Sequence, residues 1–166
     1  MNPLTPEHVQ TVLDTFDLGL RVIHYTETTF TSEDAAAAIG CSLGQIAKSM
    51  CLMARDQPIL VVGAGDQKIA DAKLARHLGV GRKRIKLATA EECVGIFGYP
   101  PGGVSPVGHR TPDIPIIVDR TLFRWETVYA AAGTPHDNFA VTPEQLVTIT
   151  GGTLLDCVKE PVLQEP

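Results

Sequence analysis

Residues 98–108 form the segment that most limits what this chain can fold into. They hold three prolines and four glycines in eleven positions, a composition that excludes both an α-helix and a regular β-strand. The segment lies mid-chain between two well-patterned regions, where an ordinary connection is shorter. A loop this stiff, with several positions that lack a Cβ atom, either brings backbone groups close to a ligand or serves only as a rigid turn. Both interpretations stay open at this point.

The length and composition are those of an ordinary globular chain. A length of 166 residues fits one domain over residues 1–166 with a single core. Hydrophobic residues make up 44% and charged residues 20%, and no apolar run approaches the roughly 20 residues of a membrane helix. The N-terminus lacks the features of a signal peptide. We therefore expect a cytoplasmic protein without membrane contact, whose tail frays from about residue 157.

Neither a metal site nor a cofactor is expected. The four cysteines form no CxxC pair, and the default for such cysteines in a reducing compartment is buried free thiols. No group of His, Asp and Glu residues has the spacing of metal ligands. The net charge of −5 argues against a broad nucleic-acid surface. The one basic cluster, residues 82–86, is either a solvated turn or a contact for RNA phosphates.

Local patterns predict a mixture of helices and strands. Capping residues and helical spacing predict helices at residues 5–16, 31–40, 66–78, 89–98 and 142–151. Apolar, β-branched runs predict strands at residues 20–25, 45–54, 58–62, 84–87, 114–118 and 126–131, with a tight hairpin at 55–57. Because helices and strands alternate without a strict βαβ rhythm, we expect an α/β fold with a mixed sheet.

Lys48 stands out within the second predicted strand. In an extended strand the side chains of Ile46, Lys48 and Met50 share one face, and those of Ala47 and Ser49 share the other. Both faces are largely apolar, so we expect a central strand that is covered on both sides. A lysine there is costly unless its ammonium meets a partner or an opening. The alternatives are a side chain that snorkels to solvent or an edge-strand charge.

Two motifs taken together resemble a known family. Residues 46–49 read Ile-Ala-Lys-Ser, and residues 102–106 form a GxxxP element about fifty residues later. Their order and spacing are similar to those of the YbaK/ProX family, also called the prolyl-tRNA synthetase-associated editing or INS domain. The resemblance extends from about residue 35 to residue 151 and is specific for the family rather than for one substrate. It implies a curved, barrel-like mixed sheet surrounded by helices, and hydrolysis of wrongly charged tRNA.

The resemblance also implies a catalytic and binding site. Lys48 and Gly102 match its catalytic positions. The lysine would act as a fixed cation that stabilises charge on the carbonyl oxygen, or as a neutral base. The loop around Gly102 would cradle the ester and the terminal adenosine. The expected substrate-binding residues are Phe30, Ser49, Gly103, Val104, Ser105, Pro106, Gly133 and His136. No Ser-His-Asp order or GxSxG elbow is present. We expect water or a substrate hydroxyl to attack the ester, with no covalent enzyme intermediate.

The leading hypothesis is a trans-acting aminoacyl-tRNA deacylase that removes a small wrong residue, such as alanine or cysteine, from proline tRNA. Mischarged tRNA and a prolyl-tRNA synthetase are the expected partners. The sequence His136-Asp137-Asn138 departs from the family pattern, which leaves the amino-acid specificity open. The alternative is a non-catalytic module of the same fold that binds an aminoacyl or nucleotide ligand or a synthetase. The retained Lys48 favours the enzyme, and the acidic surface favours the module.

Overall fold

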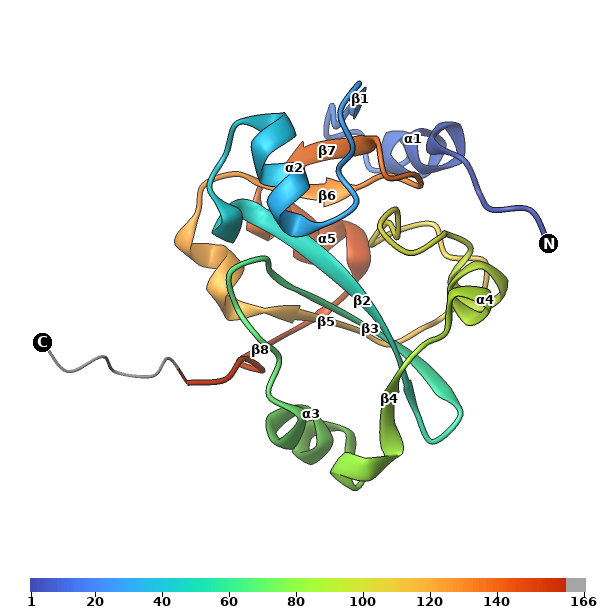
Figure 1. The fold of residues 1–166 in the computed structure, drawn as a ribbon, viewed down its shortest axis with the longest axis vertical. Coiled ribbons are helices and arrows are strands. Elements are labelled where there is room, and N and C mark those ends of the chain that lie inside the picture. Colours follow the sequence, from blue (N-terminus) through green and yellow to red (C-terminus); the bar gives the residue numbers. More distant parts are fainter. Residues whose placement is uncertain (161–166) are drawn as a thin grey trace, which may run out of the picture.

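The computed structural model describes residues 1–160 and consists of an eight-stranded curved sheet with helices packed around it (Figure 1). The strands are β1 (Val22–His24), β2 (Ile46–Ala54), β3 (Gln57–Ala64), β4 (Ile85–Leu87), β5 (Ile116–Asp119), β6 (Val128–Ala131), β7 (Asp137–Val141) and β8 (Thr153–Leu155). Their order is β1-β7-β6-β2-β3-β5-β8, and β4 pairs with β2. The β6–β2, β3–β5 and β5–β8 pairs are parallel and the others antiparallel. The predicted mixed α/β fold is therefore confirmed.

Five α-helices and several shorter turns accompany the sheet. The helices are α1 (Pro6–Asp14), α2 (Ser32–Ile39), α3 (Asp71–Leu78), α4 (Ala90–Glu92) and α5 (Pro143–Thr150). Turns of 3-10 helix cover Leu43–Gln45, Arg82–Arg84 and Arg120–Arg124, and a π-helical turn covers Cys93–Phe97. Side chains of α1, α5 and the π-helical turn join the core on one face of the sheet, and α3 covers the other. Within residues 1–160, no helix has the length and apolar character to cross a membrane.

The ends of several helices agree with their predicted capping signals. Thr142 and Gln145 form a reciprocal capping box at the start of α5. Gly40 ends α2 and Gly151 ends α5, with φ angles of 81° and 64°. This left-handed backbone is one that glycine adopts without steric cost. Local signals of this kind are readable from sequence because each involves residues only a few positions apart.

The start of α3 differs from the prediction. The helix begins at Asp71 rather than at residue 66, because the residues before it contact the C-terminal segment instead. Ile69 forms an isolated bridge with Val158, and the N–H of Ala70 donates to the carbonyl of Cys157 at 2.8 Å. Strands β7 and β8 were also absent from the predicted elements. Both are short, and both pair with strands that lie elsewhere in the chain.

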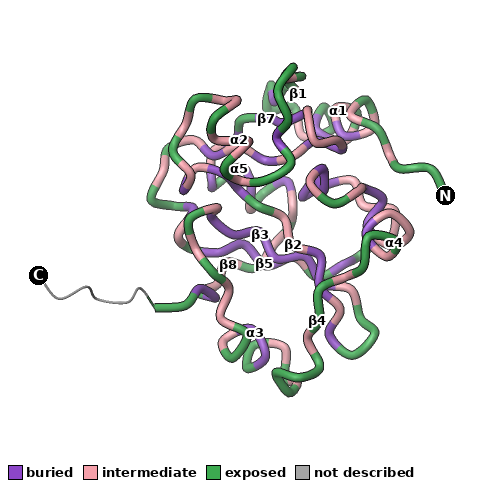
Figure 2. The backbone as a smooth tube through the Cα atoms, in the orientation of Figure 1, coloured by how far each residue is buried: buried purple, intermediate pink, exposed green. Residues whose placement is uncertain are grey.

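Strand β2 is central and covered on both faces, as its sequence predicts. Ala47 and Cys51 belong to the core cluster that includes α1 and α5. Leu52 and Ala54, on the other face, belong to the cluster that includes α3. Figure 2 shows burial concentrated along β2, β3 and β5, with exposed chain at the periphery. Lys48 is the exposed position in this otherwise largely buried strand.

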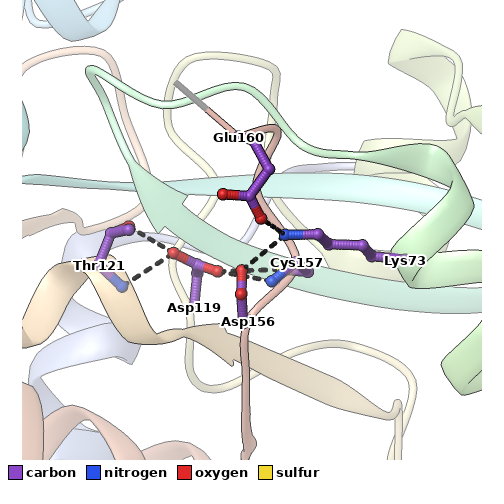
Figure 3. Close-up of polar contacts among 6 residues, drawn as sticks. All are labelled: Lys73, Asp119, Thr121, Asp156, Cys157 and Glu160. Atoms are coloured by element: carbon purple, nitrogen blue, oxygen red, sulfur yellow. Dashed lines mark hydrogen bonds and ion pairs between the residues drawn. The ribbon is translucent and has the colours of Figure 1, made fainter. Parts of the chain in front are cut away.

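The end of β5 anchors the C-terminal segment (Figure 3). The carboxylate of Asp119 is fully buried and accepts hydrogen bonds from the backbone N–H groups of Thr121 and Cys157, each at 2.9 Å. Further along, the N–H of Lys159 donates to the carbonyl of Lys68 at 2.8 Å. The chain is thus held in place beyond residue 157, which corrects the expectation that fraying begins there. The rest of the expected frayed tail, residues 161–166, lies outside the described residues.

Candidate functional site

A pocket of about 340 Å³ opens where β6 separates from β2. Along this edge, β2 pairs with β6 at Ile46 and Ala47, and its next strand partner on this edge is β4, from Leu52. Within residues 1–160, the stretch of β2 between these contacts has no strand neighbour on this side. The pocket lining comes from the start of α2, from β2, from the proline-rich loop and from the ends of β6 and β7: Thr29, Phe30, Thr31, Ser32, Glu33, Ala35, Ile46, Ala47, Lys48, Ser49, Pro101, Gly102, Val104, Ala131 and Asn138.

Lys48 lies in this gap and lines the pocket. Its register partner on β3 is Gly63, so no side chain stands beside the lysine on that neighbouring strand. None of the ion pairs within residues 1–160 involves Lys48. The lysine therefore meets an opening rather than a buried carboxylate, and its ammonium is available to a group that enters the pocket.

The proline-rich loop is fixed from inside the protein. Tyr99 is fully buried, and its hydroxyl donates to the carbonyl of Val107 at 2.7 Å and lies 2.9 Å from that of Gly108. The Nε2 atom of His109 lies 2.8 Å from the carbonyl oxygen of Ser105. Burial lowers the pKa of the His109 imidazole below its ordinary value of 6.5, so the ring is neutral at pH 7 and donates through Nε2. These bonds hold the loop backbone in one shape before any ligand binds.

Gly102 is the point where this loop meets the pocket wall. Its φ angle is 82°, and a Cβ atom there would lie 2.5 Å from the ring of Phe30. Phe30 is 54% exposed, so its ring forms an open wall of the pocket. Val104 lines the same cavity and is buried. The close approach of the Phe30 ring therefore requires a residue without a side chain at position 102.

Gly103 and Gly133 lie behind the wall rather than in the lining. The N–H of Gly133 donates to the carbonyl of Gly103 at 2.9 Å. A Cβ atom at Gly103 would lie 2.7 Å from the Cα atom of Thr134, and one at Gly133 would lie 3.2 Å from the backbone nitrogen of Pro6. Gly103 permits the proline-rich loop to pack directly on the loop that follows β6, and Gly133 permits that second loop to lie close to the start of α1.

The two serines named by the sequence have different surroundings. Ser49 lines the pocket, and its buried hydroxyl has no hydrogen-bond partner within residues 1–160. A buried hydroxyl of this kind is usually paired, so the Ser49 hydroxyl is an exception beside the pocket. Ser105 is fully buried outside the pocket lining, and its hydroxyl accepts from the N–H of Val107 at 3.3 Å. Pro106 is also absent from this lining and instead lines a second pocket of about 250 Å³.

His136 lies outside the pocket lining. Its Nδ1 atom is 3.1 Å from the carbonyl oxygens of both Tyr25 and Glu27, so this nitrogen carries the hydrogen. The ring stacks on that of His24, with centroids 5.8 Å apart. In this arrangement His136 supports the segment that leads to Phe30.

Two pocket residues escaped the sequence analysis. The side-chain amide of Asn138 donates to the hydroxyl of Thr29 at 2.9 Å, and both residues are buried and line the pocket. They were missed because β7 was not among the predicted strands. The alternation of Asp137, Phe139 and Val141 with smaller or polar residues was the signal that could have placed Asn138 on a strand.

The pocket combines one cation (Lys48), one carboxylate (Glu33), several hydroxyls, an amide and loop backbone on a partly apolar surface; the cation and the hydrogen-bond donors are the groups that bear on a developing negative charge. Such groups stabilise negative charge that develops on an oxygen atom. Within residues 1–160, no group of three or more His, Cys, Asp and Glu residues could hold a metal ion. Lys48 and the hydrogen-bond donors of the pocket offer electrostatic stabilisation and positioning.

Comparisons with known proteins agree on the family. The sequence pattern described as the aminoacyl-tRNA editing domain matches residues 26–149. The uncharacterized protein YwhH of Bacillus subtilis is 34% identical over 75% of this chain and 78% of its own length. The proline–tRNA ligase of Thiobacillus denitrificans is 32% identical over 66% of this chain, which spans only 19% of that ligase.

The fold comparison leads to the same family. A crystal structure described as a candidate trans-editing enzyme for prolyl tRNA synthetase is 34% identical, with a TM-score of 0.86 over 93% of this chain and 97% of that one. The resemblance carried by residues 46–49 and 102–106 is thus confirmed. The chain belongs to the aminoacyl-tRNA editing domain family.

Proposed function

We propose that this protein is a trans-acting aminoacyl-tRNA deacylase that works in the cytoplasm on tRNA charged with the wrong amino acid. The observation that carries the proposal is the convergence of Lys48 and Gly102 on one pocket of about 340 Å³. Small-ligand sites have volumes of roughly 300–1,000 Å³. A pocket at the lower end of this range suits a small aminoacyl ester with part of its ribose.

The chemistry follows from the polar groups of the pocket. The oxygen of a water molecule forms a bond to the carbonyl carbon of the ester, and the bond from that carbon to the ribose oxygen then breaks. The ribose oxygen takes up a proton, so the products are a free amino acid and a tRNA with a free hydroxyl. The ammonium of Lys48, which lines the pocket, would stabilise the negative charge on the carbonyl oxygen. The hydroxyl of Ser49 and the loop backbone at Gly102 would position the water and the ester.

Pocket size would set the amino-acid specificity. Ala35, Ala47 and Ala131 line the cavity with small side chains, and Ile46 and Val104 add branched apolar side chains. A methylene is worth about 1–3 kcal/mol of discrimination, so a cavity of limited size selects small residues. Phe30 presents an exposed aromatic ring at the wall, and nucleotide bases stack on such rings. We propose that the terminal adenine stacks there.

Proline tRNA is the proposed substrate, with alanine or cysteine as the wrong residue and a prolyl-tRNA synthetase as a candidate partner. Two comparisons support this choice. The relatives include proline–tRNA ligases, and one solved relative is described as a candidate trans-editing enzyme for prolyl tRNA synthetase.

The test is a deacylation assay with a panel of tRNAs, each charged with its cognate or a near-cognate amino acid. We expect the release of one small amino acid from proline tRNA, and loss of that release in Lys48→Ala. Hydrolysis of a different charged tRNA would keep the deacylase and replace the substrate. No hydrolysis across the panel, with tRNA binding intact, would refute the enzyme and leave a non-catalytic binding module.

A further inference from the structure

The end of the sheet opposite the pocket carries a concentrated positive charge. Residues 76–86 contain no Asp or Glu, although the chain as a whole has a net charge of −5. A further arginine lies next to them in the β2–β3 turn. We call this surface the basic end, and its six cations are Arg55, Arg76, Arg82, Lys83, Arg84 and Lys86.

The fold brings these cations together and leaves them exposed. The N–H of Arg55 donates to the carbonyl of Arg84 at 3.0 Å, which joins the β2–β3 turn to the segment before β4. Lys86 pairs in register with Met53, near the last residue of β2. All six cations are classed as exposed, and Figure 2 shows exposed chain between α3 and β4. Within residues 1–160, none of the six takes part in an ion pair.

The number of cations gathered there sets the basic end apart, because it holds six of the 14 lysines and arginines of the chain, whereas some cations elsewhere are neutralised by carboxylates. Lys73, which lies on the same helix as Arg76, contacts the carboxylates of Asp156 and Glu160 at 3.2 and 2.8 Å. Arg124 contacts Asp66 at 2.7 Å. On an acidic protein, a group of unpaired cations is a surface to which a polyanion binds while the remainder repels it.

Strand β2 connects this surface to the pocket. Lys48 lies near the start of the strand and Ala54 ends it beside β4 (Figure 1). At about 3.3 Å per residue, the two ends are roughly 20 Å apart. A free aminoacyl ester fills only the pocket. A tRNA that places its aminoacylated 3′ end in the pocket is long enough to cover this distance and reach the basic end.

We propose that the basic end binds the phosphate backbone of the tRNA whose charged 3′ end enters the pocket. The inference rests on the proposed function, because it takes tRNA as the occupant of that pocket. Phosphate contacts fix the register and orientation of a nucleic acid without reading its sequence. A charged edge strand also prevents strands of two molecules from pairing, but this role accounts for Lys86 on β4 and not for the exposed turn Arg82–Arg84.

The first experiment measures binding of uncharged tRNA over a range of salt concentrations. The variant carries Arg82→Gln, Lys83→Gln and Arg84→Gln together. We expect its affinity at moderate salt to fall on the order of tenfold, and the slope of log affinity against log salt to fall by about 1 for each phosphate contact removed. A control with the same net charge changes three exposed cations elsewhere: Arg21→Gln, Arg120→Gln and Lys159→Gln. The control should bind tRNA as the parent does.

The second experiment separates this inference from the proposed function. It compares hydrolysis of full-length charged tRNA with hydrolysis of a short aminoacylated oligonucleotide that carries only the 3′ end. We expect the variant at Arg82–Arg84 to have a raised KM on the tRNA and unchanged kinetics on the oligonucleotide. If the parent hydrolyses neither substrate, the proposed function fails, and the binding experiment still tests the basic end. If variant and control bind tRNA equally well, the inference is wrong, and the charge at Arg82–Arg84 serves another partner, such as an acidic protein.

Discussion

Lys48 and Asp119 are charged residues on strands of the same sheet, and their surroundings are opposite. Lys48 lies on β2 at a gap in strand pairing, is exposed, and has no ion-pair partner within residues 1–160. Asp119 ends β5, is fully buried, and accepts from the backbone of Thr121 and Cys157 as well as from the Thr121 hydroxyl. Lys48 lines the pocket, whereas the carboxylate of Asp119 accepts hydrogen bonds within the protein.

The difference gives the two charges different expected roles, Lys48 in the proposed catalysis and Asp119 in stability. A buried carboxylate persists only when hydrogen bonds replace the water it has lost, so Asp119 must act on stability. A cation that lines a pocket without an internal partner adds little to stability and is free to act on a ligand. The two residues therefore give opposite expectations for activity and for the free energy of unfolding.

The largest expected effect is that of Lys48→Ala on catalysis. Loss of a single group that stabilises an oxyanion costs about 100- to 1,000-fold in rate, so we expect kcat for deacylation to fall by that factor. The free energy of unfolding should change by less than about 0.5 kcal/mol, because the side chain is exposed. Deacylation kinetics and urea unfolding of the same preparation measure both quantities. A Lys48→Ala variant that is destabilised but has normal activity would contradict the assignment of Lys48 to catalysis.

Lys48→Arg distinguishes the two roles that the sequence leaves open. A fixed cation is partly replaced by arginine, which stays protonated at all working pH values. A neutral lysine that acts as a base cannot be replaced by arginine, because a side chain that stays protonated does not accept a proton. Partial activity in Lys48→Arg supports the cation, and an activity as low as that of Lys48→Ala supports the base.

Asp119→Ala should show the opposite pattern, with a loss of stability of about 3 kcal/mol. The change leaves the N–H groups of Thr121 and Cys157 without their acceptor in the interior, and each unpaired buried group costs about 1–3 kcal/mol. Urea unfolding gives the loss, and kcat should stay close to that of the parent at a temperature where the variant is folded. The control is Asp156→Ala, whose carboxylate is 59% exposed and contacts only Lys73 among the described residues. Equal effects from the two changes would contradict the assignment of Asp119.

The same contrast explains what could be predicted from the sequence. The alternation along β2 and the cap of α5 depend on neighbours in the chain, so both were predicted, and family motifs placed Lys48 and Gly102 together. Asn138 was missed because β7 begins with two polar residues, although β7 follows β6 directly in the chain and pairs with it. The role of Asp119 was missed because its partner Cys157 lies 38 positions away. No local pattern records contacts of that kind.

Gly102→Ala tests how closely the loop and the pocket wall fit. A Cβ atom would lie 2.5 Å from the Phe30 ring at a φ angle of 82°, a backbone conformation that costs a residue with a side chain about 1–2 kcal/mol. Since the Phe30 ring is partly exposed and can move, we expect a moderate loss of stability and roughly a tenfold rise in KM. Urea unfolding and deacylation kinetics of Gly102→Ala measure the loss of stability and the rise in KM. Adding Phe30→Ala to Gly102→Ala should restore part of the stability and none of the affinity for tRNA. If the effects of the two changes on stability simply add, the contact between position 102 and the Phe30 ring is not the cause of the loss.

His109 lies between the two classes, because its side chain is partly buried and it supports the loop that lines the pocket. Its pKa is lowered by burial from an ordinary value of 6.5. Below that pH the unfolded chain binds a proton at His109 that the native protein does not, so folding stability should decline as the pH falls through 6.5 and below. His109→Gln keeps a donor for the Ser105 carbonyl and removes the titration. Urea unfolding at pH 5, 6 and 7 should give a steeper decline for the parent than for the variant, by a small margin. The other four histidines are common to both proteins, so the difference in slope reports His109 alone, and parallel declines would mean that its proton is not linked to folding.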